Sequence, residues 1–315
     1  MTDAQTAPMA VDTPDATDSV GAESAQAREI EQAQDQEDAA AAFQRLHPRA
    51  FFERFVEQGV RPDGRSLVES RPVVIESGVV GAADGSACVS LGATRVMCGV
   101  RFLTGPPTRR PDEGEVQVSV RLLPICAPQY ENLRESLEGA SLTAYLQQLI
   151  ESGWFDRSQL CIEEGVACFT LLADIVCLAD DGNLTDACTL ALASALRDVR
   201  LPKMAVVQNK NAGGPAGPRR DTEIVQLGTD RPNKLSLDHD PRPTTFGIFG
   251  SKFLVDPTHE ELEVLDGTVS IVASPKGAVL AVFKPDGPPL LREELSSCLD
   301  MAISRARSKS SAPPP

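Results

Sequence analysis

The chain has 315 residues, a formal net charge of −15 and a pI of about 4.7. This length suffices for one large domain or two small ones, and the acidic balance argues against binding polyanions through overall charge. No apolar run approaches the roughly 20 residues of a membrane-spanning helix, and the first residues lack the basic-then-apolar pattern of a secretory signal, so neither is expected.

The acidic charge is concentrated near the N-terminus. Residues 1–42 hold ten acids and one base, Arg28, and so contribute −9, while the other residues supply −6. This segment has too few large apolar residues to bury a core. We therefore predict a disordered acidic tail at 1–42, a folded domain at 43–306 and a disordered tail at 307–315.

In chain order, the first predicted element is an amphipathic helix at 48–58, with proline in its first turn and Gly59 at its end. An RPDGR turn at 61–65 follows. The next elements, predicted from apolar runs punctuated by turn residues, are strands at 71–80, 85–91 and 94–102, a loop at 103–114, a strand at 115–123 and a helix at about 135–151.

The second half begins with predicted strands at 159–163 and 166–178 and a helix at 185–199. The later elements are a loop at 208–222, short strands near 223–228, 244–250, 252–256, 268–274 and 278–284, and a helix at about 290–306. Strands followed by a helix thus occur twice. This order predicts an α+β or α/β fold of mixed sheets flanked by helices.

The most informative segment is ADIVCLADDGNLTDACTLALASALR at 173–197, where a strand enters a tight turn and then a helix. Free N–H groups and a positive dipole make such a helix start an anion site. This turn, however, carries Asp180, Asp181 and Asp186 and no Lys or Arg. A calcium loop would place its glycine later and end on a glutamate, so we favour a tight turn with acidic N-capping over phosphate or calcium.

Other polar residues also have more than one interpretation. Asp174 lies mid-strand and is expected to be a buried carboxylate with a structural hydrogen-bonding role. Arg61 and Arg65 flank the RPDGR turn and are expected to pair with acids rather than phosphate. His239 and His259 have no recognisable nucleophile partner and are expected in turns or on the surface.

Two pairs of loop arginines are candidates for contact with an RNA backbone, although solvated charge is the default for such residues. They are Arg109 with Arg110, and Arg219 with Arg220. The eight cysteines form no CxxC pair and there are only three histidines, so we expect reduced, buried thiols and no metal or cofactor.

Three motifs together resemble the RNase PH family, in its ring subunits of the eukaryotic RNA exosome. They are RPDGR after a helix, GSACVSLGATRVMCGV at 85–100 and DIVCLADDGNLTDACTLALASALRDVRLP at 174–202, in matching order over about residues 50–306. The segments FLVDPTHEE and FKPDG strengthen the likeness. The resemblance implies an RNase PH-like fold.

The chain departs from the active members of that family at two places. Phosphorolytic relatives read roughly DGGTRTA at the turn, where the arginine holds phosphate, whereas here the turn is DGNLTDA. Thr185 takes the arginine position, within a degenerate phosphate-site turn of Asp181, Gly182, Asn183, Thr185 and Asp186. Active members also carry an acid two places before a proline, and the matching DPRPTTF stretch has Pro241 there, before Pro243.

The resemblance therefore implies a ring subunit without phosphorolytic chemistry. Its implied partners are the other RNase PH-like ring subunits, the S1/KH cap subunits, a separate catalytic nuclease and RNA, with no membrane. The implied locations are nucleus, nucleolus and cytoplasm. Two alternatives are an active phosphate-dependent 3′–5′ exoribonuclease and an RNase PH-fold binding protein outside the exosome.

Overall fold

The computed structural model describes residues 44–127, 130, 137–208, 222–227 and 233–308. The chain divides into two compact units, Met1–Pro62 and Asp63–Pro315. In the first unit, α2 (Pro48–Glu57) begins with its proline, as expected. The predicted tail at 1–42 lies outside the described residues, as does the tail at 307–315 apart from two residues that continue the last helix.

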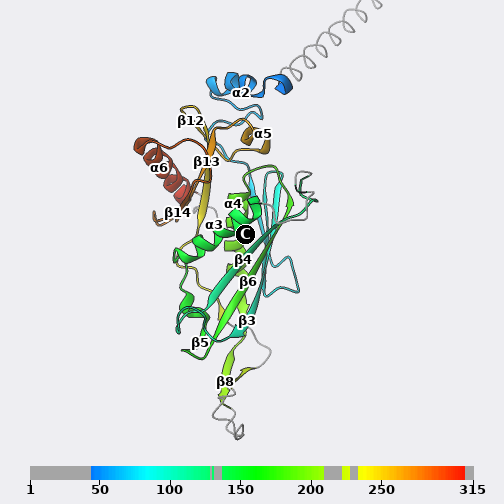
Figure 1. The fold of residues 1–315 in the computed structure, drawn as a ribbon, viewed down its shortest axis with the longest axis vertical. Coiled ribbons are helices and arrows are strands. Elements are labelled where there is room, and N and C mark those ends of the chain that lie inside the picture. Colours follow the sequence, from blue (N-terminus) through cyan, green and yellow to red (C-terminus); the bar gives the residue numbers. More distant parts are fainter. Residues whose placement is uncertain (1–43, 128–129, 131–136, 209–221, 228–232, 309–315) are drawn as a thin grey trace, which may run out of the picture. The chain divides into compact units, whose positions relative to one another are not determined.

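The second unit begins with a mixed six-stranded sheet in the order β1-β2-β3-β6-β4, with β5 also paired to β6 (Figure 1). Its strands are β1 (Val73–Ser77), β2 (Gly85–Leu91), β3 (Thr94–Gly105), β4 (Glu115–Leu122), β5 (Cys161–Glu163) and β6 (Ala167–Ala179). The pairing of β4 with β6 is parallel and the others are antiparallel. β3 and β4 alternate buried with exposed residues, as strands with one wet face do.

Two helices pack against this sheet and share one apolar core with it: α3 (Leu137–Glu151) and α4 (Leu184–Asp198). α4 is buried on nearly every side, and many of its buried residues are alanines. Small side chains let the sheet approach closely. A Cβ at Gly85 would lie 2.7 Å from the carbonyl oxygen of Ala195, so β2 needs glycine there.

A second, antiparallel sheet has the order β12-β11-β13-β14. Its strands are β11 (Arg242–Phe249), β12 (Lys252–Val255), β13 (Gly267–Ala273) and β14 (Val279–Phe283), with α5 (His259–Leu262) between β12 and β13. α4 contacts β11 and α3 contacts β14, where the rings of Tyr145 and Phe283 lie 4.6 Å apart. The last helix, α6 (Arg292–Ser308), packs on β11 and β13 over a smaller apolar cluster.

The remaining elements are short. They are the 3₁₀ helix η2 (Arg157–Leu160), the ribbon of β8 (Met204–Gln208) with β9 (Thr222–Gln226), and the pair of β7 (Arg200–Leu201) with β10 (Asn233–Lys234). The expected fold of mixed sheets flanked by helices is confirmed. None of the described helices is long and apolar enough to cross a membrane.

Candidate functional site at the strand–turn–helix junction

The turn at Asp180–Asn183 joins the end of β6 to the start of α4. Gly182 (φ 83°) and Asn183 (φ 57°) both adopt left-handed backbone. A Cβ at Gly182 would lie 2.6 Å from the backbone nitrogen of His259, so only glycine permits this approach. The His259 N–H also donates to the carbonyl of Asp181 at 3.1 Å. The turn is therefore held against the start of α5.

Asp256, directly after β12, is the centre of the polar contacts behind this turn. Its carboxylate is buried and accepts hydrogen bonds from Arg71 N (2.8 Å), Nε (3.0 Å) and Nη2 (2.8 Å), and from Asn183 Nδ2 (2.7 Å). Burial by itself raises the pKa of Asp256, but the hydrogen bonds and charge of Arg71 outweigh burial and hold that pKa below its ordinary value. Asp256 is therefore ionised at neutral pH.

Arg71 connects Asp256 to the turn. Its Nη1 donates to the Asp181 carbonyl at 2.8 Å and lies 3.1 Å from Asp181 Oδ2, and its Nη2 donates to the Gly182 carbonyl at 3.2 Å. Burial lowers the pKa of Arg71, yet its contacts with Asp256 and Asp181 leave that pKa raised. Thr94 Oγ1 completes the turn by donating to the Gly182 carbonyl at 2.7 Å. The guanidinium is thus fully occupied inside the protein.

Asp186 lies in the first turn of α4, as expected, but its carboxylate does not cap the helix. It accepts hydrogen bonds from Asn183 Nδ2 (3.0 Å), Thr245 N (3.0 Å) and Thr245 Oγ1 (2.7 Å). The N-cap residue of α4 is Asn183, without a side-chain capping bond. The expected acidic N-capping is therefore wrong, because the buried carboxylate reaches across to β11. Burial raises the pKa of Asp186 despite these hydrogen bonds.

These residues form one buried network, which we call the Asp256 cluster: Arg71, Thr94, Asp181, Asn183, Asp186, Thr245 and Asp256. Arg65 borders it, with Nη1 3.4 Å from Asp256 Oδ2 and Nε 2.5 Å from Asp63 Oδ2. Thr185 is half-buried, and its carbonyl accepts a hydrogen bond from Thr189 Oγ1 at 2.7 Å. The guanidinium that contacts the turn is therefore that of Arg71, on the inner side, and it is already paired with carboxylates.

A small cavity of about 20 Å³ adjoins the cluster, with Ser70, Asp186, Thr244, Asp256 and Arg305 among its lining residues. This volume holds about one water molecule. Arg305 extends from α6 and donates to the Val68 carbonyl at 2.6 Å, and burial lowers its pKa. The cavity is too small for a phosphate group. Across the described residues, no group of three or more His, Cys, Asp or Glu is placed to hold a metal ion.

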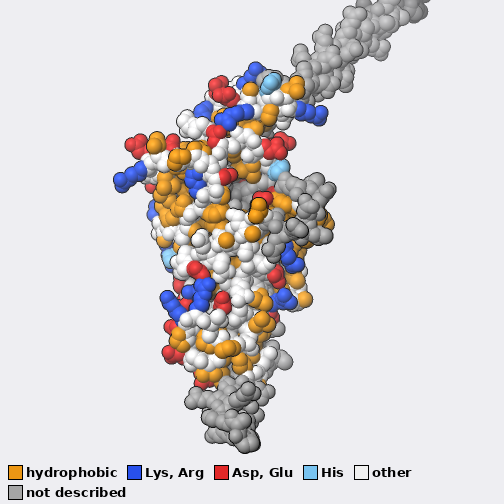
Figure 2. Space-filling model, in the orientation of Figure 1, with side chains coloured by type: hydrophobic (Ala, Val, Ile, Leu, Met, Phe, Trp, Pro, Cys, Tyr) orange, Lys and Arg blue, Asp and Glu red, His pale blue; other side chains and the backbone are white. Residues whose placement is uncertain are grey.

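Arg109 and Arg110 lie far from this turn. They follow β3, whose Gly105 pairs with Cys168 near the start of β6, whereas the turn follows the end of that strand. Arg109 is paired with Glu151, and Arg110 Nη1 lies 2.7 Å from Glu113 Oε1. On the face drawn in Figure 2, described Lys and Arg side chains are interspersed with Asp and Glu. Contact of these arginines with RNA stays a prediction, and Arg219 and Arg220 lie outside the described residues.

The other candidates have different outcomes. Asp174 was expected to be buried, which is wrong: its side chain is 36% exposed and lies 3.3 Å from Arg101 Nη2 on the wet face of the sheet. Arg65 pairs with acids as expected. The side chain of His259 is 41% exposed, and the half-buried His239 has Nδ1 3.3 Å from Ser274 Oγ.

Sequence analysis missed Arg71, Thr245 and Asp256, whose contacts join residues 59 to 185 positions apart. No local pattern reports such pairs. The one local signal near these residues was the Thr-x-x-Glu pattern of Thr258 and Glu261. It predicts a capping box at the start of a helix, and these residues form that box in α5.

Two sheets with a helix pair between them, connected through the strand–turn–helix junction of β6 and α4, define an α+β protein. Both domains of the 3′ exoribonuclease family match the chain, domain 1 over residues 69–202 and domain 2 over residues 241–305. The chain belongs to this family, which is the RNase PH family. The Asp256 cluster lies where the two family domains meet, since Arg71 and Asp186 come from the first and Thr245 and Asp256 from the second.

Similar proteins include exosome components. The exosome complex component Rrp42 of Thermococcus gammatolerans is 33% identical over 253 residues, which cover 80% of this chain and 88% of that protein. Rrp42 of Archaeoglobus fulgidus is 34% identical over 249 residues, covering 78% and 88%. A solved structure of the Archaeoglobus fulgidus exosome with RNA bound to the active site contains a chain with TM-score 0.69 and 32% identity, covering 83% of this chain and 96% of that one.

The structure of rice (Oryza sativa) Rrp46 has a TM-score of 0.55 and covers 79% of this chain and 97% of that one. Its 17% identity supports the shared fold alone.

Proposed function

We propose that this chain is a non-catalytic ring subunit of an RNA exosome. It supports 3′-to-5′ RNA processing and degradation, including ribosomal RNA maturation and messenger RNA turnover, by building the ring and lining its RNA channel. The main observation that supports a lack of phosphorolysis is the Asp256 cluster, which lies on the inner side of the phosphate-site turn. The similarity to Rrp42 proteins of archaeal exosomes supports the ring position.

The charge at the turn argues against phosphorolysis. The family's phosphate-holding arginine is replaced by Thr185, and the nearest guanidinium, that of Arg71, is held by Asp256 and Asp181. Asp181 is 40% exposed on its side chain and adds negative charge where a phosphate would approach. Pro241, in the position of the family's acid, is buried and carries no proton to transfer. The turn therefore lacks both the charge stabilisation and the general acid that a phosphate-dependent exoribonuclease needs.

The finer assignment rests on sequence resemblance. The segments FFERFVEQGVRPDGR, DGNLTDACTLALASAL and FLVDPTHEE most resemble the eukaryotic subunit called ribosomal RNA-processing protein forty-three, with its two non-catalytic sister subunits as near alternatives. The proposed partners are the other ring subunits, the S1/KH cap subunits, an associated nuclease and RNA. The proposed locations are nucleus, nucleolus and cytoplasm.

Affinity purification from the source cells tests the assignment. A tagged full-length chain should recover other RNase PH-fold proteins and S1/KH proteins in near-equal amounts. The matched control carries the same tag on an unrelated protein of similar charge. Recovery of the chain alone, or with partners of other folds, would favour a binding protein outside the exosome.

A further inference from the structure

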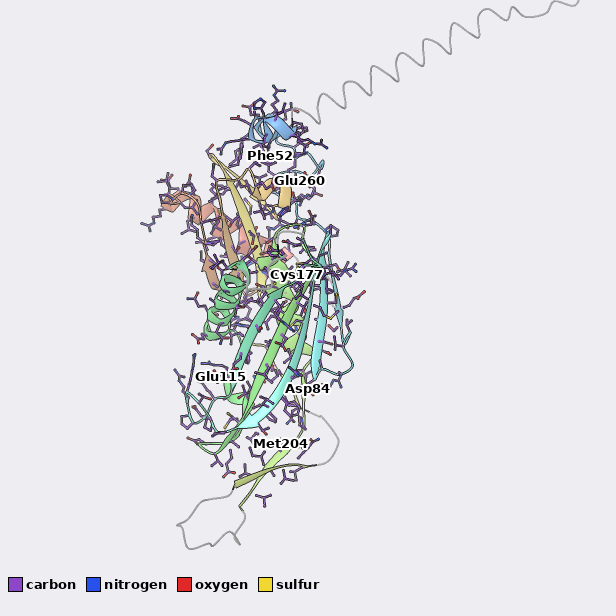
Figure 3. The ribbon with its side chains drawn as sticks, turned by 45° about the vertical axis from the view of Figure 1, so that its right-hand side comes forward. Phe52, Asp84, Glu115, Cys177, Met204 and Glu260 are labelled. Atoms are coloured by element: carbon purple, nitrogen blue, oxygen red, sulfur yellow. The ribbon has the colours of Figure 1, made fainter. Side chains whose placement is uncertain are left out.

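The outer edge of the second sheet is a strand of apolar residues. β14 is hydrogen-bonded to β13 on one side, and within the described residues no other strand pairs with it. Figure 3 shows this strand on the side of its sheet away from α5, whose Glu260 is labelled. Figure 2 shows hydrophobic side chains gathered over α6 and β14. The backbone N–H and C=O groups on the outer side of β14 are therefore open to pairing with another strand.

The side chains of β14 are only partly covered. Phe283 packs toward α3 and the main core. Val282 pairs in register with Ile271, which belongs to the apolar cluster under α6, yet Val282 is 48% exposed. Val279 is 42% exposed. Edge strands are commonly protected by a charge or a proline, and the sequence VLAVF of β14 contains neither.

The sequence of β14 is complementary to itself. Two β14 strands paired antiparallel and centred on Ala281 are related by a two-fold axis. Val279 of one copy then lies opposite Phe283 of the other. Leu280 likewise lies opposite Val282, so every cross-strand pair in the ladder is apolar.

The charges beside the strand fit the same register. Lys276, in the turn before β14, aligns with Asp286 of the other copy, because each lies five residues from Ala281. Both residues are exposed. The other charged residue between them, Lys284, aligns with Ala278, so no like charges face each other. A second copy of this chain therefore matches the edge in both apolar pattern and charge.

We propose that the free chain forms a two-fold dimer in which β14 of each copy pairs antiparallel with β14 of the other. The second sheets of the two copies then form one continuous sheet across the axis. A ladder of five residues buries little surface, so the dimer is weak and its amount depends on protein concentration. The dimer is a property of the free chain and does not depend on the proposed exosome function.

Sedimentation equilibrium of the purified full-length chain over a range of concentrations tests the proposal. The average mass should rise with concentration from that of the 33.6 kDa monomer toward twice that value. Hydrogen–deuterium exchange followed by mass spectrometry locates the contact. The peptide that contains 279–283 should exchange more slowly at concentrations where the dimer forms. Peptides from β1, the edge strand of the first sheet, should exchange at an unchanged rate.

Val282→Lys is the disrupting variant, because it places a cation from each copy close to the two-fold axis. It should raise the dissociation constant of the dimer by about 100-fold, about tenfold for each copy. Val74→Lys is the matched control: Val74 is 55% exposed on β1, and this variant should form the dimer as the wild type does.

The exchange data on the wild-type chain decide the question even if a variant misfolds. A chain that stays monomeric at every soluble concentration would overturn the proposal. So would a dimer that leaves exchange at 279–283 unchanged, or one that Val282→Lys and Val74→Lys weaken equally.

Discussion

Replacing Asp256 by alanine removes the centre of the buried network. The change deletes five hydrogen bonds to the Asp256 carboxylate, three from Arg71 and one each from Arg65 and Asn183. It leaves the buried guanidinium of Arg71 with the partly exposed Asp181 as its carboxylate partner. Removing one partner of a buried ion pair costs about 3–5 kcal/mol. Asp256 also has left-handed backbone (φ 56°), which costs alanine about 1–2 kcal/mol more. The free energy of unfolding should therefore fall by about 4–7 kcal/mol.

Urea denaturation followed by tryptophan fluorescence measures this loss, since the single tryptophan, Trp154, is fully buried. Asp181→Ala is the matched control, because it removes a partly exposed carboxylate from the same Arg71 and should cost at most about 1 kcal/mol. Asp256→Asn keeps a residue that tolerates left-handed backbone and should fall between the two. If Asp256→Ala unfolds at the same urea concentration as Asp181→Ala, the cluster does not hold the two family domains together.

Four further outcomes are expected. Asp186→Ala should lower the free energy of unfolding by about 1–3 kcal/mol, because it leaves the buried Thr245 N–H without its acceptor, and an unchanged urea midpoint would contradict this. The pKa of Asp256 is lowered on folding, so its contribution is present above the unfolded value of about 3.9 and is lost as pH falls through the folded pKa. The stability difference between wild type and Asp256→Asn should therefore shrink below about pH 4, and a constant difference would refute the ion pair. Thr185→Arg should not create phosphorolysis, since Asp181 stays at the turn and no general acid is restored, and release of nucleoside diphosphates by this variant would show otherwise. Deleting residues 1–42 should leave the urea midpoint unchanged, whereas a clear drop would show that this segment docks.

Local patterns predicted the elements whose residues form a continuous signal. The strand expected at 85–91 is β2 to the residue, and the helix expected at 185–199 differs from α4 by one residue at each end. The same reasoning missed β8, because its five residues precede a segment rich in glycine and asparagine. It also misjudged Asp174, which alternates with buried neighbours and so points to the wet face of β6.

The site itself was only partly predictable. The Asp-Gly-Asn sequence indicated a tight turn, and the missing arginine indicated a changed charge. The partners that use those residues could not be read from the sequence, since Arg71 and Thr245 lie on elements distant from the turn in the chain. The acids of the turn were therefore interpreted as helix caps. Asp186 instead accepts hydrogen bonds from Thr245 on the second sheet. The pairing of Asp256 with Arg71 leaves no free guanidinium there to hold a phosphate.

The most direct test of the central claim measures phosphorolysis. The purified full-length chain, and a ring reconstituted with it, are incubated with an RNA 3′ end, inorganic phosphate and magnesium, and nucleoside diphosphates are quantified. A catalytic RNase PH-family protein run in parallel shows that the assay detects turnover. The account predicts no nucleoside diphosphate from the isolated chain, and no loss of ring activity in the Asp181→Ala variant. Phosphate-dependent shortening of RNA by the isolated chain that persists through repurification would contradict it.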